Sequence, residues 1–600
     1  MDIHNKPGNL VELFEMSLAC NADRPLFGTA DQTGVYTWTT YREVASRTDN
    51  LRGGMAQNGI KKGESVGIIA NNREEWAIAA FAAFGLEAMF VPMYEKELPH
   101  IWKHIINDSH VKILFVANET ILSSIEQFRD DCPQLEQVYL IDGTKIATIH
   151  DLELQGKKYP QDAMHPAPGD IAVLIYTSGT TGSPKGVLLS HNNFVSNVLA
   201  GSIMYPEFNN HYRSLSILPW AHSYGLTAEL FNFINMGGSM GFIRNVNTII
   251  EDMYSVAPTF LIAVPRVFNK IYDGLWSKMN ETGGLALKLF TLGLESAKLL
   301  RQLPSEGKTA LLLKLQLKLA DLIVFSKIRK RFGGNLTGAL TASAMMNIEV
   351  AQFFTDIGIP VFDAYGLTET SPAVTMNNRK DNRPGSVGRP IDKVQVVIDR
   401  LATHEAGNEG EIVVYGPNVM HGYHNKPEAT FEVMTENGGF RTGDLGYLDD
   451  DGFLFVTGRI KEQYKLENGK YVFPVSIEEE IQMSPWVENV LIYGEGRSHN
   501  ICLIVPNFHN LSNWARQQGI DCQSHHELLK STEVKTMVNE SILHHLQGKF
   551  GGYEMPREIL LIEEPFSVDN GMLTQTMKLK RKKVLEHYGE QVDLAYSTRR

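Results

Sequence analysis

Residues 171–186 read Ile-Ala-Val-Leu-Ile-Tyr-Thr-Ser-Gly-Thr-Thr-Gly-Ser-Pro-Lys-Gly, an apolar run followed by a loop of small and hydroxylated residues. The run 171–176 has the composition of a buried strand. In the loop, glycines let backbone N–H groups approach phosphate oxygens, hydroxyls add donors, and Lys185 adds a positive charge. The loop is therefore predicted to bind a polyphosphate, although its composition alone also fits a surface turn. A Walker A loop is excluded, because two residues separate the second glycine from the lysine.

The alternation of strands with other segments continues along the chain. Short β-branched or apolar runs alternate with helical patterns, which is typical of an α/β fold with substantial parallel sheet. Ligands of such sheets gather where the strands end. Strands are expected at 65–70, 111–116, 137–141, 171–176, 215–218 and 361–363, and a helix is expected at 74–88.

Composition and charge narrow the class of protein. A chain of 600 residues exceeds what one hydrophobic core usually supports, so we expect at least two domains. A formal charge of −13 argues against a general nucleic-acid binder, which needs a basic face. The four cysteines lack the Cys-x-x-Cys spacing of a zinc or redox site, and Met1–Pro7 lacks the features of a secretory signal. We expect reduced thiols and a cytoplasmic location.

The character of the sequence changes near Gly458. A turn-rich segment at 449–452 gives way to alternating charge and then to a smaller segment. We therefore expect a large N-terminal domain at residues 1–458 and a small C-terminal domain at 459–600.

The region from 285 to 331 is rich in leucine and lysine at helical spacing. It predicts two amphipathic helices with a break at 304–308. Charged residues interrupt its most apolar part, which is too short to span a membrane. Two interpretations stay open: packing against the main body, or peripheral contact with the inner face of a membrane. The second is aided by the cations Lys327, Arg329, Lys330 and Arg331.

The string from Tyr176 to Gly186 resembles the signature loop of the adenylate-forming superfamily, which includes acyl-CoA synthetases. The resemblance implies an N-terminal domain of stacked α/β layers, a small mobile α+β C-terminal domain, and ATP as a substrate. It places the phosphates of ATP on Thr177, Ser178, Gly179, Thr180, Thr181, Gly182 and Lys185.

Residues 364–370, Ala-Tyr-Gly-Leu-Thr-Glu-Thr, resemble the second nucleotide motif of the superfamily. The resemblance implies that Tyr365 lies against adenine, that Thr368 meets the α-phosphate, and that Glu369 holds Mg²⁺. Mg²⁺ is a hard cation that favours one or two carboxylates together with phosphate oxygens. Asp363 and Gly366 are included among the nucleotide-binding residues.

Two later segments resemble the motifs for ribose and for the domain junction. In Phe-Arg-Thr-Gly-Asp-Leu-Gly, residues 440–446, the resemblance implies that Asp444 accepts hydrogen bonds from the ribose hydroxyls. In Thr-Gly-Arg-Ile-Lys-Glu, residues 457–462, it implies that Arg459 supports the ribose and that Lys461 is the hinge.

The segment Leu-Pro-Trp-Ala-His-Ser-Tyr-Gly, residues 218–225, resembles the motif beside the acyl site. His222 is the expected substrate-binding residue, and a buried structural histidine is the alternative. Residues 264–272 and the helical region at 285–331 resemble the long-chain fatty-acid–CoA ligase branch specifically.

Residues 570–581 resemble the catalytic-lysine segment of this branch, which places Lys578 at the catalytic position. The competing interpretation is that five cationic residues form a solvated helix face, namely Lys578, Lys580, Arg581, Lys582 and Lys583. We expect that role for all of them except Lys578.

Two departures from the family pattern bear on the substrate. Residues 341–346 read Thr-Ala-Ser-Ala-Met-Met where the family usually shows Ser-Gly-Gly-Ala-Pro-Leu, and Gln575 replaces a proline. Ala342 and Ser343 add volume where backbone borders adenine and the acyl entrance. We expect a shorter or differently shaped acyl pocket.

The expected function is ATP-dependent long-chain fatty-acid–CoA ligation, with ATP and CoA as co-substrates and Mg²⁺ as the metal. The expected catalytic residues are Lys185, Thr368, Glu369 and Lys578. The alternatives are a fatty-acyl-AMP ligase that serves a carrier protein, a luciferase-like oxygenase, and a catalytically silent protein that binds nucleotide or membranes.

Overall fold

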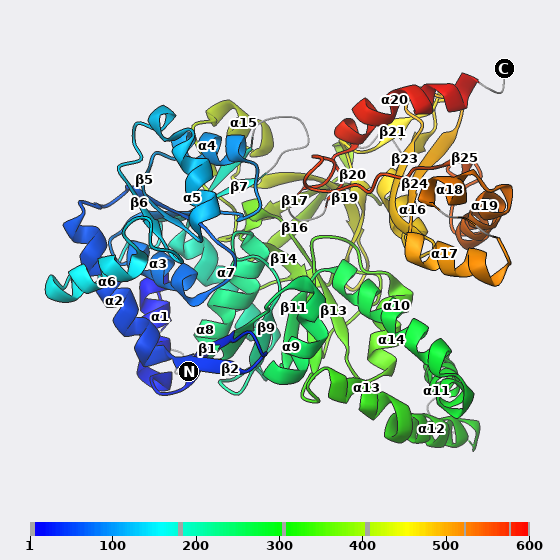
Figure 1. Cartoon of the computed structure of the whole chain (residues 1–600), viewed down its shortest axis with the longest axis horizontal. Coiled ribbons are helices and arrows are strands. Elements are labelled where there is room, and N and C mark those ends of the chain that lie inside the picture. The colour runs from blue at the N-terminus through cyan, green and yellow to red at the C-terminus, as the bar shows by residue number, and fades with distance from the viewer. Residues whose placement is uncertain are drawn as a thin grey trace. The chain divides into compact units, whose positions relative to one another are not determined.

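The computed structural model describes residues 6–597, apart from 178–183, 303–307, 403–407, 521, 523 and 575–577. The chain forms two compact units, which Figure 1 shows coloured along the sequence. The first unit contains residues 1–397, 413–442 and 448–455. The second contains 398–412, 443–447 and 456–600. Helices and strands alternate through most of the first unit, which confirms the predicted α/β class.

A seven-stranded sheet carries the two strands that flank the phosphate loop. Its order is β18-β8-β7-β4-β3-β5-β6. The strands from β7 to β6 pair in parallel, whereas β8 pairs antiparallel with both β7 and β18. The bounds are β3 Ser65–Ile69, β4 Met89–Met93, β5 Val111–Val116, β6 Gln137–Leu140, β7 Ile171–Thr177, β8 Lys185–Ser190 and β18 Gly422–Tyr423.

Burial explains why these runs form strands. Residues 172–176 of β7 are all buried, as expected for a strand of a sheet that is covered on both faces. The predicted strands 65–70, 111–116, 137–141 and 171–176 are confirmed to within one residue. The predicted strand at 215–218 lies two residues earlier, as β9 Arg213–Ser216. The helix predicted at 74–88 ends at Phe84, because Gly85 follows as the C-cap and Glu87 has a φ of 54°.

Among the described residues, three further sheets precede the C-terminal segment. The first has the order β2-β1-β10-β9, with β1 Pro25–Ala30, β2 Tyr36–Thr40, β9 Arg213–Ser216 and β10 Ser239–Phe242. The second has the order β11-β12-β13-β14-β15, with β11 Phe260–Ala263, β12 Gly338–Thr341, β13 Val361–Gly366, β14 Ala373–Met376 and β15 Arg389–Pro390. The third has the order β16-β17-β19-β20, with β16 Gln395–Asp399, β17 Gly410–Tyr415, β19 Phe440–Leu448 and β20 Leu454–Arg459.

Polar side chains cap the N-termini of several helices in the first unit. Thr40 and Ser190 each form a capping box, at the starts of α2 and α7. The bounds are α1 Leu10–Asn21, α2 Tyr41–Gln57, α3 Glu74–Phe84, α4 Pro99–Asp108, α5 Glu119–Glu126, α6 Ile149–Lys158, α7 His191–Met204, α8 Asn232–Met236, α9 Ile249–Val256, α10 Pro265–Thr282, α14 Ile348–Asp356 and α15 Pro427–Val433.

The region from 285 to 331 forms helices, as predicted. They are α11 Gly284–Gln302, α12 Lys308–Ala320, a π-helical turn η4 Asp321–Phe325, and α13 Ser326–Arg331. The predicted break at 304–308 lies almost wholly outside the described residues. The helices α11 and α12 lie side by side (Figure 1), joined by a hydrogen bond of 3.1 Å from Ser296 Oγ to Gln316 Oε1. Within the described part of the chain, no helix combines the length and apolar character of a membrane span.

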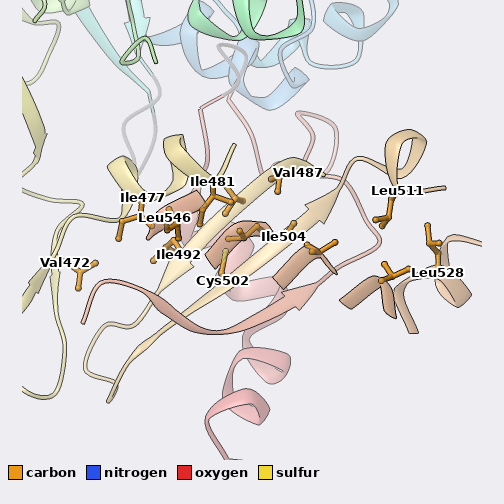
Figure 2. Close-up of a cluster of buried hydrophobic side chains, with 14 of the residues drawn as sticks. Val472, Ile477, Ile481, Val487, Ile492, Cys502, Ile504, Leu511, Leu528 and Leu546 are labelled. Carbon is orange, nitrogen blue, oxygen red and sulfur yellow. The ribbon is translucent and has the colours of Figure 1, made fainter. Parts of the chain in front are cut away.

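The C-terminal segment has its own core. The strands β23 Val487–Tyr493, β24 Asn500–Pro506 and β25 Pro556–Leu561 form one sheet, beside the hairpin β21 Tyr464–Lys465 and β22 Tyr471–Val472. Figure 2 shows buried side chains that gather on this sheet, including Ile492, Cys502 and Ile504. The helices are α16 Pro474–Ile481, α17 Phe508–Gln517, α18 His525–Lys530, α19 Thr532–Leu546 and α20 Arg581–Ser597.

A buried ion pair at the start of α20 corrects one expectation. Arg581 was expected on a solvated cationic face, but it donates to both carboxylate oxygens of Glu478, at 2.7 Å for Nη1 to Oε1. Glu478 is only 8% exposed, and burial raises the pKa of its carboxyl against the opposing effect of Arg581. Arg581 is thus a structural anchor, because a buried carboxylate requires a paired charge.

Candidate active site

The two ends of the phosphate loop lie beside each other. In the antiparallel pairing of β7 with β8, Tyr176 is opposite Gly186 and Thr177 is opposite Lys185. The predicted loop residues between them, Ser178, Gly179, Thr180, Thr181 and Gly182, lie outside the described residues. The pairing therefore places Lys185 where the strand from the loop re-enters the sheet.

The helix α4 braces both ends of this loop. Tyr176 Oη donates a 2.6 Å hydrogen bond to Asp108 Oδ2, and His104 Nε2 lies 3.2 Å from the carbonyl oxygen of Pro184. Burial and the neighbouring carboxylate raise the pKa of Tyr176, so the phenol remains a donor. None of these braces was predicted, because α4 is far from the loop in sequence.

The second nucleotide motif forms a tight turn after β13. Tyr365 ends the regular part of the strand, and Thr368 and Glu369 begin the 3₁₀ turn η5 Thr368–Thr370. A Cβ on Gly366 would lie 1.8 Å from the carbonyl oxygen of Pro372, so only glycine fits there. Leu367 N donates to the same oxygen at 3.1 Å. Asp363, earlier on β13, lies opposite Thr341 of β12.

The segment with His222 contacts this turn directly. Ser223 Oγ is 3.3 Å from Thr368 Oγ1, and Thr227 Oγ1 donates a 2.9 Å hydrogen bond to the carbonyl oxygen of Ser371. His222 is half-buried and its Nδ1 accepts a hydrogen bond of 3.1 Å from Tyr224 N. Residues 218–225 and the turn at 364–370 are therefore joined side chain to side chain.

The buried carboxylate of Glu229 supports the segment that carries His222. Glu229 is fully buried and accepts hydrogen bonds from Ser214 Oγ at 2.5 Å, Ser216 Oγ at 2.6 Å and Trp220 Nε1 at 3.0 Å. Burial raises the pKa of Glu229, and the three donors oppose that rise. Trp220 precedes His222 by two residues, so this network fixes the backbone that presents His222.

Ala342 and Ser343 follow β12 directly. Ala342 is 7% exposed, and Ser343 is half-buried with a φ of 77°. Residues with side chains rarely adopt such a positive φ, so the backbone at Ser343 is one that favours glycine. Tyr224 Oη donates to the carbonyl oxygen of Leu340 at 3.0 Å, which ties the acyl motif to the same strand.

Tyr423 joins the two nucleotide motifs and was missed by the sequence analysis. Its Oη donates a 2.9 Å hydrogen bond to Glu369 Oε1, and Lys185 Nζ lies 4.9 Å from the centre of its ring. Tyr423 lies on β18, a strand of two residues that shows no periodicity. The only available signal was an aromatic residue next to Gly422.

The donors present fit a magnesium ion that is held mainly by ATP. Glu369 would supply one carboxylate, and among the described residues no three His, Cys, Asp or Glu side chains gather into a metal-binding cluster. A single hard oxygen ligand is what Mg²⁺ requires when phosphate oxygens and water supply the rest.

The remaining predicted residues belong to the second unit. Arg459 Nε donates a 2.6 Å hydrogen bond to Asp444 Oδ1, whose side chain is 6% exposed. Lys461 is exposed on the turn that follows β20. Lys578 is exposed, and its N–H donates to Thr574 Oγ1 at 3.0 Å. Gln575, the second departure from the family pattern, lies outside the described residues.

A family comparison covers most of the chain. Residues 14–424 match the model of the AMP-binding enzyme family, and residues 461–545 match that of the AMP-binding enzyme C-terminal domain. The chain belongs to the AMP-binding enzyme family.

Curated relatives confirm the predicted branch, the long-chain acyl-CoA synthetases. The peroxisomal long chain acyl-CoA synthetase 6 of Arabidopsis thaliana is 31% identical over 588 residues, 94% of this chain and 82% of the relative. Long-chain-fatty-acid–CoA ligase 5 of Rattus norvegicus is 31% identical over an alignment of 622 residues, which covers 98% of this chain and 88% of the relative.

A solved structure confirms the predicted fold. The adenylation domain of a carboxylate reductase from Mycobacterium chelonae has a TM-score of 0.79 and 22% sequence identity, over 99% of this chain and 92% of that domain. The chain thus has the adenylate-forming fold, with a large α/β domain and a small C-terminal domain.

Gly366→Ala should disrupt the turn that carries Thr368 and Glu369, because the new Cβ would overlap the Pro372 carbonyl. We expect ATP–pyrophosphate exchange to fall by about 100-fold, the cost of misplacing reacting groups by an ångström. Gly169→Ala is the control, since nothing lies within 4 Å of a Cβ there. Equal activity of both variants would contradict the steric argument.

Proposed function

We propose that this chain is an ATP-dependent, AMP-forming long-chain fatty-acid–CoA ligase. The observation that carries the proposal is the placement of Lys185 and Glu369 on one tyrosine, Tyr423, in a chain of the AMP-binding enzyme family. A lysine and a magnesium carboxylate held together suit a triphosphate. The long-chain relatives, which match nearly the whole chain, support the acid and the thiol.

The reaction has two halves. In the first, a carboxylate oxygen of the fatty acid attacks the α-phosphorus of ATP, and pyrophosphate leaves to give acyl-AMP. In the second, the sulfur of CoA attacks the acyl carbonyl and AMP leaves. Activation is needed because a free carboxylate is a poor electrophile. Within the first half, Lys185 and Lys578 offset negative charge on the phosphates, and Thr368 donates to the α-phosphate.

The other proposed roles follow the same nucleotide. Mg²⁺, when bound at Glu369, neutralises phosphate oxygens. Tyr365 and Gly366 border adenine, with Asp363 behind them, and Asp444 accepts from the ribose with Arg459 in support. The proposed acyl-site residues are His222, Ala342 and Ser343. The proposed loop donors are Thr177, Ser178, Gly179, Thr180, Thr181 and Gly182.

The small domain is proposed to move between the two halves. The boundary between the large and small domains after Gly458 remains our prediction. Lys461 is the proposed hinge, and the small C-terminal domain carries Lys578. Rotation about a hinge would withdraw Lys578 after adenylation and present another face to CoA.

Product analysis tests the function. We expect AMP and acyl-CoA from purified protein with ATP, Mg²⁺, CoA and a graded panel of fatty acids, with the longer acids preferred. Full AMP release without CoA would contradict the ligase assignment, and acyl transfer only to a carrier protein or to oxygen would favour the alternatives. A preference for short acids would contradict the long-chain assignment.

Lys578→Ala separates the two half-reactions. We expect adenylate formation to fall by about 100-fold or more, because a charge that stabilises the transition state is lost. Thioester formation from supplied acyl-AMP and CoA should stay close to wild type. Lys582→Ala is the matched control, and it should leave both half-reactions unchanged. An equal loss of both half-reactions in Lys578→Ala would count against its proposed role.

We also propose that α12 and η4 rest on an anionic membrane surface, in a protein that is otherwise cytoplasmic. Both interpretations of this region have support, because α12 is apolar on two faces. Ala310, Leu313, Ala320 and Val324 are buried, whereas Leu311, Leu312, Leu315, Leu319 and Leu322 are 46–73% exposed.

The charge around these exposed leucines supports a lipid partner. Lys314, Lys318, Lys327, Lys330 and Arg331 are all exposed, in a chain whose formal charge is −13. Leucines that enter the headgroup region, with cations beside them, are the pattern of an interfacial helix. A fatty acid also partitions into membranes, so such contact would place the enzyme beside its substrate.

Leu315→Ser with Leu319→Ser should weaken vesicle binding. We expect co-sedimentation with vesicles of phosphatidylcholine and phosphatidylglycerol to fall by about tenfold, from the lost apolar burial. Leu154→Ser, at another exposed leucine, is the control. Binding that is unchanged in the double variant would contradict this contact, and a concentration-dependent dimer lost in the variant would assign the surface to a second copy.

A further inference from the structure

Tyr423 touches two groups of opposite charge. Its Oη donates to Glu369 Oε1 at 2.9 Å, and the Lys185 ammonium lies over its ring at 4.9 Å from the centroid. All three residues belong to the first compact unit. The ring therefore connects the proposed magnesium carboxylate to the proposed phosphate lysine.

The backbone holds Tyr423 in this position from both sides. His424 N donates to the carbonyl oxygen of Gly186 at 2.8 Å, which ties β18 to the start of β8. Met420 N donates to the carbonyl oxygen of Glu369 at 2.9 Å, which ties the same segment to the magnesium turn. Tyr423 N donates to Thr430 Oγ1 at 2.9 Å. The position of the ring is thus fixed relative to both motifs.

Each contact restricts one charged side chain. The phenol hydrogen bond fixes one oxygen of Glu369 and therefore the direction of the carboxylate. The ring face attracts the ammonium of Lys185 through its quadrupole. Without the ring between them, the Lys185 ammonium and the Glu369 carboxylate would be free to approach each other, because the attraction of opposite charges grows as the distance falls. Such a pair would withdraw both groups from the nucleotide.

We propose that Tyr423 is a positioning residue that keeps Lys185 and Glu369 apart and oriented for Mg–ATP. This inference rests on the proposed function. Tyr423 acts through its two neighbours and has no role at the reacting atoms. The hydroxyl serves the magnesium carboxylate and the ring serves the lysine, so the two contributions separate by substitution.

Two substitutions distinguish the contributions. Tyr423→Phe removes the hydrogen bond and keeps the ring, so the Mg²⁺ concentration for half-maximal ATP binding should rise about fivefold, as for one lost hydrogen bond. ATP binding at saturating Mg²⁺ should change little. Tyr423→Leu also removes the ring, so ATP binding at saturating Mg²⁺ should weaken by a further factor of about three.

The measurement is calorimetric titration with ATP at graded Mg²⁺ and without fatty acid, so it does not depend on turnover. Tyr139→Phe is the matched control, because it removes a phenol of the same unit whose hydrogen bond goes to Gln137 of its own strand. The thermal midpoint of each variant shows whether the fold is kept.

A double-mutant cycle identifies the route of the effect. If Tyr423 acts through Glu369, the Mg²⁺ effect of Tyr423→Phe should vanish in a Glu369→Gln background. An effect of equal size there, or an unchanged Mg²⁺ requirement in Tyr423→Phe alone, would overturn the inference and leave the proposed function standing. Failure of the wild-type protein to bind Mg–ATP would overturn both.

Discussion

The pairing of β8 with two antiparallel neighbours is the constraint on which the candidate site depends. The parallel part of the large sheet ends at β7, and β8 returns from the phosphate loop to cover that edge. Because β8 in turn offers its far edge to β18, residues from late in the first unit reach Lys185. The backbone ladder, more than any single side chain, decides which groups meet at the candidate site.

The buried strands could be predicted because they leave local patterns. Apolar runs such as 111–116 and 171–176 specify buried strands within their own residues. Contacts between distant residues leave no such pattern, which is why Tyr423, Ser223 and Glu229 were missed. A two-residue strand such as β18 is too short to show a period. The predicted roles of the site residues rest on resemblance, and five of the loop residues lie outside the described chain.

Two expectations show where pattern reasoning reaches its limit. Arg581 stands among lysines in the sequence, and only the folded chain reveals that it enters the core to meet Glu478. In α12, leucines occupy both faces, so helical spacing cannot say which face packs. The structure shows that one face is buried and that the other is exposed. The composition predicted the helix, whereas the elements packed around α12 decide which of its faces is buried and which is exposed.

The anchor at Arg581 limits the reach of the lysine upstream of it. The three residues from Lys578 to Arg581 span about 10 Å when fully extended. Lys578 can therefore move no farther than this from Arg581 unless Arg581 leaves the carboxylate of Glu478. Motion of the loop alone therefore moves Lys578 only a short distance. Any longer travel of the lysine has to be transmitted as a rigid displacement of the whole C-terminal core, with the ion pair acting as the coupling.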